Sequence, residues 1–512
     1  YGDHRDLHLS IRRQRQMCIR DRNIPDEVYW IDNAFGGMPT FQLGAKFAYD
    51  ILSPFHLLFR FIPRPAHTLF LYLLTMYILL MVLKIPWRIA ILGSVAFAFS
   101  TYLLIILQVG HNTKALAIAY IPLVVAGLVL LRQNKLLPGF LVSLLGISLQ
   151  IRANHYQMTY YMLILLGIYL IVYLIDSYRK KDLKEYFKYI GIFALAGILS
   201  LGLNAPNILS TYDYSKYSTR SQSELKLNPD GTEKQISTGL DYDYITQYSY
   251  GIFESINLIA PRVQGGASSE DIGRNSDLYK FLVDNNVPRK QADSFVSSVP
   301  TYWGDQPILE APAYIGASIF FLFILSLFIV KGPFKWWLLI SFIISLTLSW
   351  GKNFPLLTNF FIDYFPFYNK FRAVSSIQII IEFAVPFLSV IGLHKFLGDF
   401  NVKNINRTFI AFTVPLVLLF LFKGSLSFSG LYDNYYTNAY GPEIFGMIVE
   451  ERQNIFKKDI IRAIIIGILL FATLRSYKLI GRNFTFLIVS VSYTNLRAHE
   501  TDSYRVCRLL LE

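Results

Sequence analysis

Three groups of charged residues have the types and spacing to do chemistry at a membrane surface. The first group is acidic and contains Asp26, Glu27 and Asp32. A carboxylate held near the bilayer can act as a general base on a hydroxyl, so these three acids are the candidate catalytic residues. The alternative is an ordinary solvated loop, because carboxylates are common in loops.

The second group is basic and lies in the two phrases VGHNTK and QIRANHYQ, which supply the candidate substrate-binding residues His111, Lys114, Arg152 and His155. Cations at the end of a membrane span can hold a lipid phosphate or pyrophosphate. The alternative is that they only anchor the helix ends by reaching to the interface. The two histidines lack the close spacing of a metal site. We therefore predict no cofactor, and a requirement for a divalent metal stays open.

The third group surrounds an apolar stretch that contains a single acid, Glu382, preceded by Lys370 and Arg372. With a rise of 1.5 Å per residue, Glu382 lies about 15 Å along the helix from Arg372. It is therefore inside the bilayer, where an ionisable group is costly and usually functional or paired. Arg372 is too distant to pair with it, so we expect a partner from another helix. The alternative is a purely structural pair.

A long Tyr-rich segment adds one more candidate substrate-binding residue, Arg220. Tyrosine rings pack against the C–H faces of sugars, and their hydroxyls bond sugar hydroxyls. An aromatic belt at the membrane interface is the competing explanation.

The composition identifies the elements that must hold these groups. Of 512 residues, 53% are hydrophobic and 16% are charged, whereas about 25% charged residues is usual in soluble domains. This composition excludes a disordered chain, and the 31 Gly and 2 Cys exclude a collagen or a disulfide scaffold. We predict an all-α polytopic membrane protein. The net charge of +13 comes mostly from short loops between apolar stretches, so we predict no nucleic-acid partner.

The sequence predicts about twelve transmembrane spans, because a span needs roughly 17–25 apolar residues. The expected spans lie at about 66–83, 89–107, 115–131, 136–151, 157–175, 189–203, 313–330, 336–350, 374–393, 408–422, 460–474 and 479–490. The loop 176–188 carries five basic residues, and the positive-inside rule places such loops in the cytoplasm.

This orientation divides the chain into two membrane regions and several outer segments. The membrane regions are 66–204 and 313–490, and the large loop 205–312 between them lies outside. The other outer segments are 23–65, 351–373 and 424–459. Because 23–65 is outside, we expect a further span before it.

Both ends of the chain differ in character from the rest. Residues 1–22 contain RQRQMCIRDR, and residues 491–512 read VSYTNLRAHETDSYRVCRLLLE. Both runs resemble translated sequencing-adapter sequence, so we interpret them as artefacts. They contain both cysteines, Cys18 and Cys507. The remaining chain therefore has no disulfide and no thiol nucleophile.

Six phrases together resemble the bacterial YfhO-like membrane proteins. They are WIDNAFGGMPTFQ (30–42), GHNTKALAIAYIPLVVAG (110–127), NAPNILSTYDYSKYSTRSQSEL (204–225), PTYWGDQPILEAPAYIGA (300–317), LSWGKNFPLLTNFFIDYFPFYNKFRAVS (348–375) and the Glu382 helix that follows. The resemblance covers about 23–490 and implies a GT-C-like glycosyltransferase bundle in the bacterial cytoplasmic membrane. The implied donor is a polyprenyl-phosphate sugar, and the implied acceptor is a cell-envelope glycan or lipid on the outer face.

The resemblance also bears on the catalytic acid. In the GT-C pattern, an acidic residue of the first outer loop is the base. The usual acidic motif of the family falls upstream of residue 23 here, and Asp26 and Glu27 match only the later end of that loop.

Two other functions compete with the glycosyltransferase hypothesis. A transporter or flippase for lipid-linked glycans would favour charges on several helices and an inverted repeat. The sequence has one mid-membrane acid, Glu382, and no repeat, which favours the enzyme. The second alternative is a non-catalytic envelope-assembly protein that uses 205–312 as a binding segment.

Overall fold

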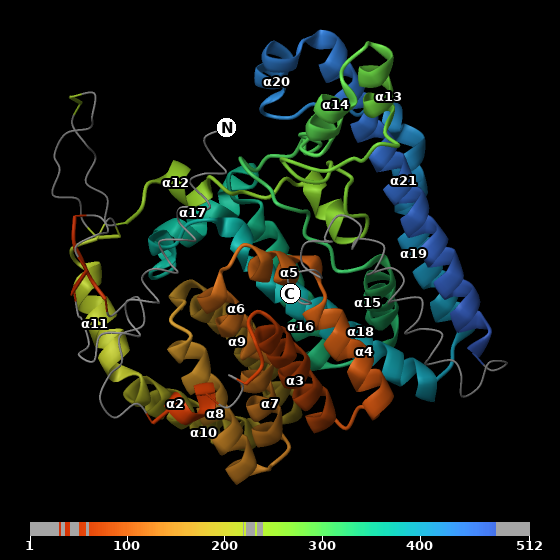
Figure 1. The fold of residues 1–512 in the computed structure, drawn as a ribbon. Helices are drawn as coiled ribbons and strands as arrows, with labels where there is room; N and C mark the ends of the chain where they lie inside the picture. The colour runs from red at the N-terminus through yellow and green to blue at the C-terminus, as the bar shows by residue number, and fades with distance from the viewer. Residues whose placement is uncertain are drawn as a thin grey trace.

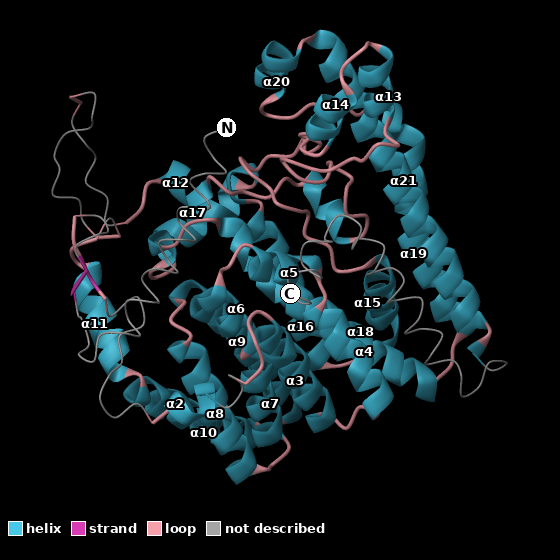
Figure 2. Ribbon diagram, viewed as in Figure 1, coloured by secondary structure: helices cyan, strands magenta, loops and turns pink. Residues whose placement is uncertain are grey.

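The computed structural model describes residues 30–31, 36–40, 51–57, 61–218, 220–221, 231–232 and 239–477. These residues are mainly helical (Figure 2). The strands β1 (Trp30–Ile31) and β2 (Met38–Pro39) form one short antiparallel pair. Several sequence predictions fall outside the described residues: the acids Asp26, Glu27 and Asp32, both adapter-like ends, and the expected span 479–490.

The first half of the chain folds into a bundle of apolar helices (Figure 1). Its helices are α2 (Ser53–Leu57), α3 (Ala66–Val82), α4 (Trp87–Ala98), α5 (Thr101–Gln108), α6 (Asn112–Ala119), α7 (Ile121–Arg132), α8 (Leu136–Arg152), α9 (Tyr156–Lys180) and α10 (Leu183–Leu203). Long apolar runs favour this arrangement, because a helix satisfies its backbone hydrogen bonds within one segment.

The second half adds helices that share one hydrophobic core with the first. They are α15 (Ala317–Ile329), α16 (Pro333–Ser349), α18 (Ile379–Gly398), α19 (Val402–Leu421) and α21 (Pro442–Arg475). Helix α18 is at the centre, where it packs against α4, α15 and α16. Nearly all of its side chains are buried, which explains why its sequence is apolar on every side.

Five helical segments of the described chain are long and apolar enough to cross a membrane: Asn112–Arg132, Tyr156–Lys180, Leu183–Leu203, Val374–Gly398 and Val402–Ser425. Helices α4 and α5 make a sixth if the pair, bent by 51°, is one span. The all-α class is therefore confirmed, and the apolar helices support a membrane protein. The number twelve is not confirmed, because α3, α8, α15 and α16 are shorter apolar helices of 10–17 residues.

The segments between these helices form a separate layer along the upper side of the bundle in Figure 1. We call residues 239–312 and 426–459 the cap. Its elements are α12 (Tyr242–Thr246), η1 (Phe253–Leu258), α13 (Asp277–Asp284), α14 (Arg289–Val296), α20 (Asp433–Tyr440) and the first half of α21. A small core that includes Leu278, Val296 and Ile448 joins α13 and α14 to α21. The location of 205–312 outside the membrane stays a prediction.

The remaining short elements connect the longer helices. They are α11 (Ala205–Ser215), η2 (Gly351–Asn353), α17 (Pro355–Tyr364), η3 (Tyr368–Lys370), η4 (Val374–Gln378) and η5 (Phe422–Ser425). Helix α17 exposes Leu356, Phe360 and Tyr364, and with 10 residues it is too short to span a bilayer.

Arg452 of α21 fastens the parts of the cap to one another. Its side chain is fully buried. One guanidinium nitrogen donates to the Asp433 carboxylate at 3.0 Å and to the Phe428 carbonyl at 2.9 Å. The other donates to the carbonyls of Pro300 at 3.2 Å and Tyr302 at 3.4 Å. A single cation therefore ties two separate segments, 300–302 and 428–433, to α21.

Helices α7 and α8 approach so closely that glycine is required at their contact. A Cβ added at Gly127 would lie 2.5 Å from the backbone nitrogen of Ser143 and 2.8 Å from its Cα. A Cβ added at Gly139 would lie 2.7 Å from the backbone nitrogen of Leu131. Small residues of this kind let helix backbones meet inside membranes.

We expect Gly127→Ala to lower the stability of the folded protein by about 1–3 kcal/mol, the usual cost of overpacking. The new methyl group meets backbone atoms of α8, which cannot move aside as a side chain can. Thermal unfolding of the purified protein in detergent measures the effect. The matched control is Gly167→Ala in α9, where no atom lies within 4 Å of the added Cβ. An equal loss in both variants would show that the helix contact is not the cause.

Candidate functional site

Five basic side chains from separate segments lie within electrostatic reach of one another. His111 precedes α6, Lys114 is in the first turn of α6, and His155 precedes α9. Arg220 follows α11, and Arg372 precedes η4. His111 interacts electrostatically with Lys114 and Arg372. His155 interacts in the same way with Lys114, His111 and Arg220. Arg220 in turn interacts with Arg372. We call these five residues the cation cluster.

Neutral groups hold Lys114 and Arg372 in position. Lys114 Nζ donates to the hydroxyls of Tyr102 and Ser376, both at 3.0 Å. Arg372 donates to the Tyr244 hydroxyl at 2.7 Å, and its guanidinium lies 5.1 Å from the centre of that ring. Within the described ranges, neither cation forms an ion pair. Their positive charge is therefore available to an anion.

Backbone carbonyls fix the rest of the cluster. Gln157 Nε2 donates to the Arg372 carbonyl at 2.6 Å and so ties α9 to the segment before η4. Arg220 and Lys370 each donate to the other's carbonyl oxygen, with Lys370 Nζ at 2.7 Å. Lys370 therefore lies beside the cluster.

The two histidines are neutral near pH 7. Burial, followed by the charge of Lys114, lowers the pKa of His155 to about 4. Burial, followed by the charges of Lys114 and Arg372, also lowers the pKa of His111. Desolvation and neighbouring cations both disfavour a charged imidazole. The positive charge of the cluster therefore belongs to Lys114, Arg220 and Arg372.

Arg152 lies three residues before His155 in the sequence. It is in the last turn of α8, and its charge acts on Tyr120, at the junction of α6 and α7. The structure therefore brings together five of the predicted substrate-binding residues, with Lys370 adjoining them.

Glu382 lies apart from the cluster, inside α18 with 0% of its surface exposed. In the described part of the chain, neither of its carboxylate oxygens has a hydrogen-bond partner. The hydroxyl of Ser100, at the bend between α4 and α5, faces it. The group that interacts with Glu382 from another segment is therefore a neutral hydroxyl, and the choice between a functional acid and a structural pair stays a prediction.

Sequence reasoning did not single out Glu254 and Asp305, whose carboxylates lie close together. A Cβ built at Gly251 would lie 2.9 Å from Asp305 Oδ2 and 3.1 Å from Glu254 Oε2. Glu254 accepts hydrogen bonds from the Gly251 N–H at 2.6 Å and from the Tyr302 O–H at 2.7 Å. Burial raises the pKa of Glu254 to about 7. The only sequence signal for this pair is two acids in a Tyr-rich segment.

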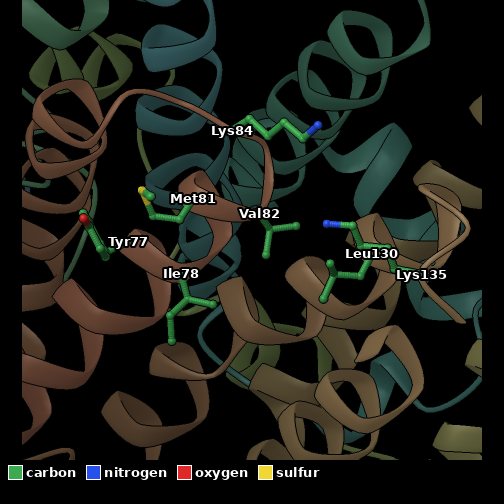
Figure 3. Close-up of a pocket in the computed structure, with 7 residues that line it drawn as sticks. All are labelled: Tyr77, Ile78, Met81, Val82, Lys84, Leu130 and Lys135. Carbon is green, nitrogen blue, oxygen red and sulfur yellow. The ribbon is translucent and has the colours of Figure 1, made fainter. Parts of the chain in front are cut away.

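An open hollow of about 400 Å³ lies elsewhere, between the α3–α4 and α7–α8 turns (Figure 3). Its lining residues are Tyr77, Ile78, Met81, Val82, Lys84, Leu130 and Lys135. None of the predicted site residues lines it, so it is not part of the candidate site. Among the residues that the structure describes, no group of three or more His, Cys, Asp or Glu side chains could hold a metal ion.

Comparisons with known proteins identify no relative of this chain. No protein-family model matches it, and neither the curated proteins nor the solved structures contain a match. The resemblance to YfhO-like proteins therefore rests on the sequence phrases alone.

Proposed function

We propose that the protein is a GT-C-type membrane glycosyltransferase. It moves a sugar from a polyprenyl-phosphate donor to an envelope glycan or lipid acceptor on the outer face of the bacterial cytoplasmic membrane. The observation that carries this proposal is the cation cluster. Lys114, Arg220 and Arg372 gather beside apolar helices, and the hydroxyl partners of Lys114 and Arg372 leave their charge uncompensated. Phosphate is the anion that such a group of cations binds best.

The apolar surroundings distinguish a lipid phosphate from a free one. Lys114 lies in the first turn of the apolar segment Asn112–Arg132, and Arg372 shortly precedes Val374–Gly398; both segments are long and apolar enough to span a bilayer. Helix α17, with its exposed aromatic side chains, ends shortly before Arg372. A phosphate bound here keeps its polyprenyl chain in an apolar environment, which favours a lipid-linked donor.

The chemistry assigned to the cluster is stabilisation of the leaving group. The acceptor hydroxyl attacks C1 of the sugar, and the bond from C1 to the phosphate oxygen breaks with both electrons leaving on the phosphate. Lys114 and Arg372 neutralise the charge that develops there. A carboxylate takes the acceptor proton, and Asp26, Glu27 and Asp32 are the candidates, although they lie outside the described residues.

The test replaces cations of the cluster one at a time in the full chain. We expect Lys114→Ala and Arg372→Ala each to reduce sugar transfer by roughly ten- to a hundredfold, because each loses a charge-assisted bond to phosphate. The assay measures incorporation of radiolabelled sugar from a polyprenyl-phosphate donor into envelope material. Arg289→Ala, which removes an exposed cation of α14, is the control and should retain full activity.

Two outcomes would contradict the proposal. Full activity of both Lys114→Ala and Arg372→Ala would exclude the cluster from the site. An equal loss in Arg289→Ala would show a general effect of charge rather than phosphate binding. Protein levels in the membrane, measured for each variant, separate a lost activity from a lost fold.

One observation favours a second candidate, the transporter or flippase. Helices α4 and α5 are separated by a 51° bend at Ser100, and interrupted helices at mid-membrane are common in transporters. Reconstituted vesicles distinguish the two functions. A flippase moves a lipid-linked glycan across the bilayer without forming a glycosidic bond, whereas the enzyme forms the bond.

A further inference from the structure

A group of unpartnered polar atoms surrounds Glu382. We call its five residues the polar chamber. The atoms are Glu382 Oε1 and Oε2, Ser100 Oγ, Tyr250 OH, Gln378 Nε2 and Asn257 Nδ2. None of them makes a hydrogen bond of ordinary geometry in the described chain, but Ser100 lies near enough to interact with Glu382, and Gln378 and Asn257 lie near enough to interact with Tyr250. None of the five residues is more than 2% exposed. Buried polar atoms are nearly always hydrogen-bonded, and several of them together are what a chain of ordered water molecules bonds.

The helix packing explains how these atoms meet. Ser100 lies at the bend between α4 and α5, where the helix is interrupted. The rings of Phe97 and Phe383 meet edge to face at 6.3 Å and hold α4 against α18 next to Glu382. Pro386, one turn further along α18, has no N–H and so leaves the Glu382 backbone carbonyl without its usual helical donor.

A line of protonatable groups leads from the polar chamber to the protein surface. Tyr250 interacts electrostatically with both Glu382 and Glu254. Glu254 in turn lies beside Asp305 across Gly251. Asp305 is half-buried and accepts a hydrogen bond from Asn353 Nδ2 at 3.0 Å. The order from surface to interior is therefore Asp305, Glu254, Tyr250 and Glu382.

We propose that Glu382 is a proton-binding site that exchanges its proton with the cap side of the molecule through Tyr250 and Glu254. In one transfer, relayed by water molecules in the chamber, protonated Glu254 gives up a proton toward the Tyr250 oxygen, while the original Tyr250 hydroxyl proton passes to the Glu382 carboxylate. Asp305 then returns a proton from solvent to Glu254. A tyrosine hydroxyl both donates and accepts, so Tyr250 is unchanged after the transfer.

The groups that face Glu382 fit a proton better than a metal cation. Ser100 faces it from the α4–α5 bend, Tyr250 from the cap, and Gln378 from the preceding turn. In the described residues, no Lys, Arg or His forms an ion pair with Glu382. The amide N–H groups of Gln378 and Asn257 present positive charge to the chamber, which disfavours a sodium ion. An unpaired ionised carboxylate is costly inside a membrane, and a bound proton removes that charge.

The experiment follows the proton rather than any sugar chemistry. Infrared difference spectroscopy of the full chain in lipid nanodiscs detects the carbonyl band of a protonated carboxylic acid, and Glu382→Gln identifies which band belongs to Glu382. The rate at which that band shifts after transfer to D2O measures proton exchange. We expect Tyr250→Phe, which keeps the ring and removes the hydroxyl, to slow the exchange by at least about tenfold, the effect of a barrier roughly 1.4 kcal/mol higher.

The matched control is Tyr169→Phe. Tyr169 is also buried, and its hydroxyl is also unpartnered in the described residues, but it packs against Trp337 and not in the chamber. Its variant should exchange at the wild-type rate. If Tyr250→Phe does not fold, Glu254→Gln interrupts the same line and is expected to slow the exchange equally.

Three results would overturn the proposal: an unchanged exchange rate in Tyr250→Phe, an equal slowing in Tyr169→Phe, or a Glu382 band that disappears when sodium is added at constant pH. The last result would assign the chamber to a metal cation. None of these readouts depends on sugar transfer, so the proton site and the glycosyltransferase proposal can fail separately.

Discussion

Replacing Arg452 with alanine is expected to lower the free energy of unfolding by about 3–5 kcal/mol, the usual cost of breaking a buried ion pair from one side. The Arg452 side chain is fully buried and bonds the Asp433 carboxylate together with the carbonyls of Phe428 and Pro300. Alanine supplies none of these donors. The Asp433 carboxylate would lose its counter-charge, and two carbonyls inside the cap would lose their partners.

Unfolding of the purified full chain in detergent, followed by circular dichroism, measures this loss. The control is Arg274→Ala, because Arg274 pairs with Asp293 through two bonds of 2.7 and 2.8 Å but its side chain is 71% exposed. An exposed pair contributes roughly 0–1 kcal/mol. A loss in Arg452→Ala no larger than that in Arg274→Ala would contradict the structural role of the buried cation.

The second large effect is a dependence of stability on pH that comes from Glu254. Burial raises the pKa of this carboxyl from 4.5 to about 7, so the folded protein binds a proton more tightly than the unfolded chain does. The stabilising contribution is complete below pH 4.5 and is lost as the pH rises through about 7. A difference of this size corresponds to roughly 3 kcal/mol.

Glu254→Gln isolates this contribution, because an amide cannot titrate. We expect the difference in unfolding free energy between wild type and Glu254→Gln to change by about 3 kcal/mol between pH 4.5 and pH 8, with wild type losing stability as the pH rises. Glu310→Gln, at an exposed position, should run parallel to wild type. If Glu254→Gln also runs parallel to wild type, the carboxyl does not titrate in this range.

The helices could be predicted from the sequence, but their lengths could not. The expected spans in the described chain fall on helices, because long apolar runs leave few other ways to satisfy the backbone. The span expected at 89–107 is an exception in form, because it is two helices with a 51° bend between them. The break at Ser100 lies in FAFSTYLL, which contains neither Pro nor Gly. It is stabilised by a distant segment, since Thr101 bonds the carbonyls of Pro312 and Tyr314. The residues around Ser100 do not by themselves indicate a contact with a segment more than 200 residues away.

The sequence could single out residues of the cation cluster as candidates, but it could not show that they lie close together. Lys114, His155 and Arg372 stood out because they are polar groups at the ends of apolar stretches. That they approach one another depends on how α6, α9 and η4 pack. Glu254 and Asp305 could not be paired from sequence, because their separation is set by the absence of a side chain at Gly251.

The 34-residue length of α21 has a mechanical consequence. At 1.5 Å per residue it is a rod about 50 Å long, with Arg452 fixed in the cap and its second half packed along α19 (Figure 1). One continuous helix therefore belongs both to the cap and to the bundle, so the two cannot move independently without bending α21 or separating it from α19. Spin labels at its two ends should keep a constant separation while the cap moves.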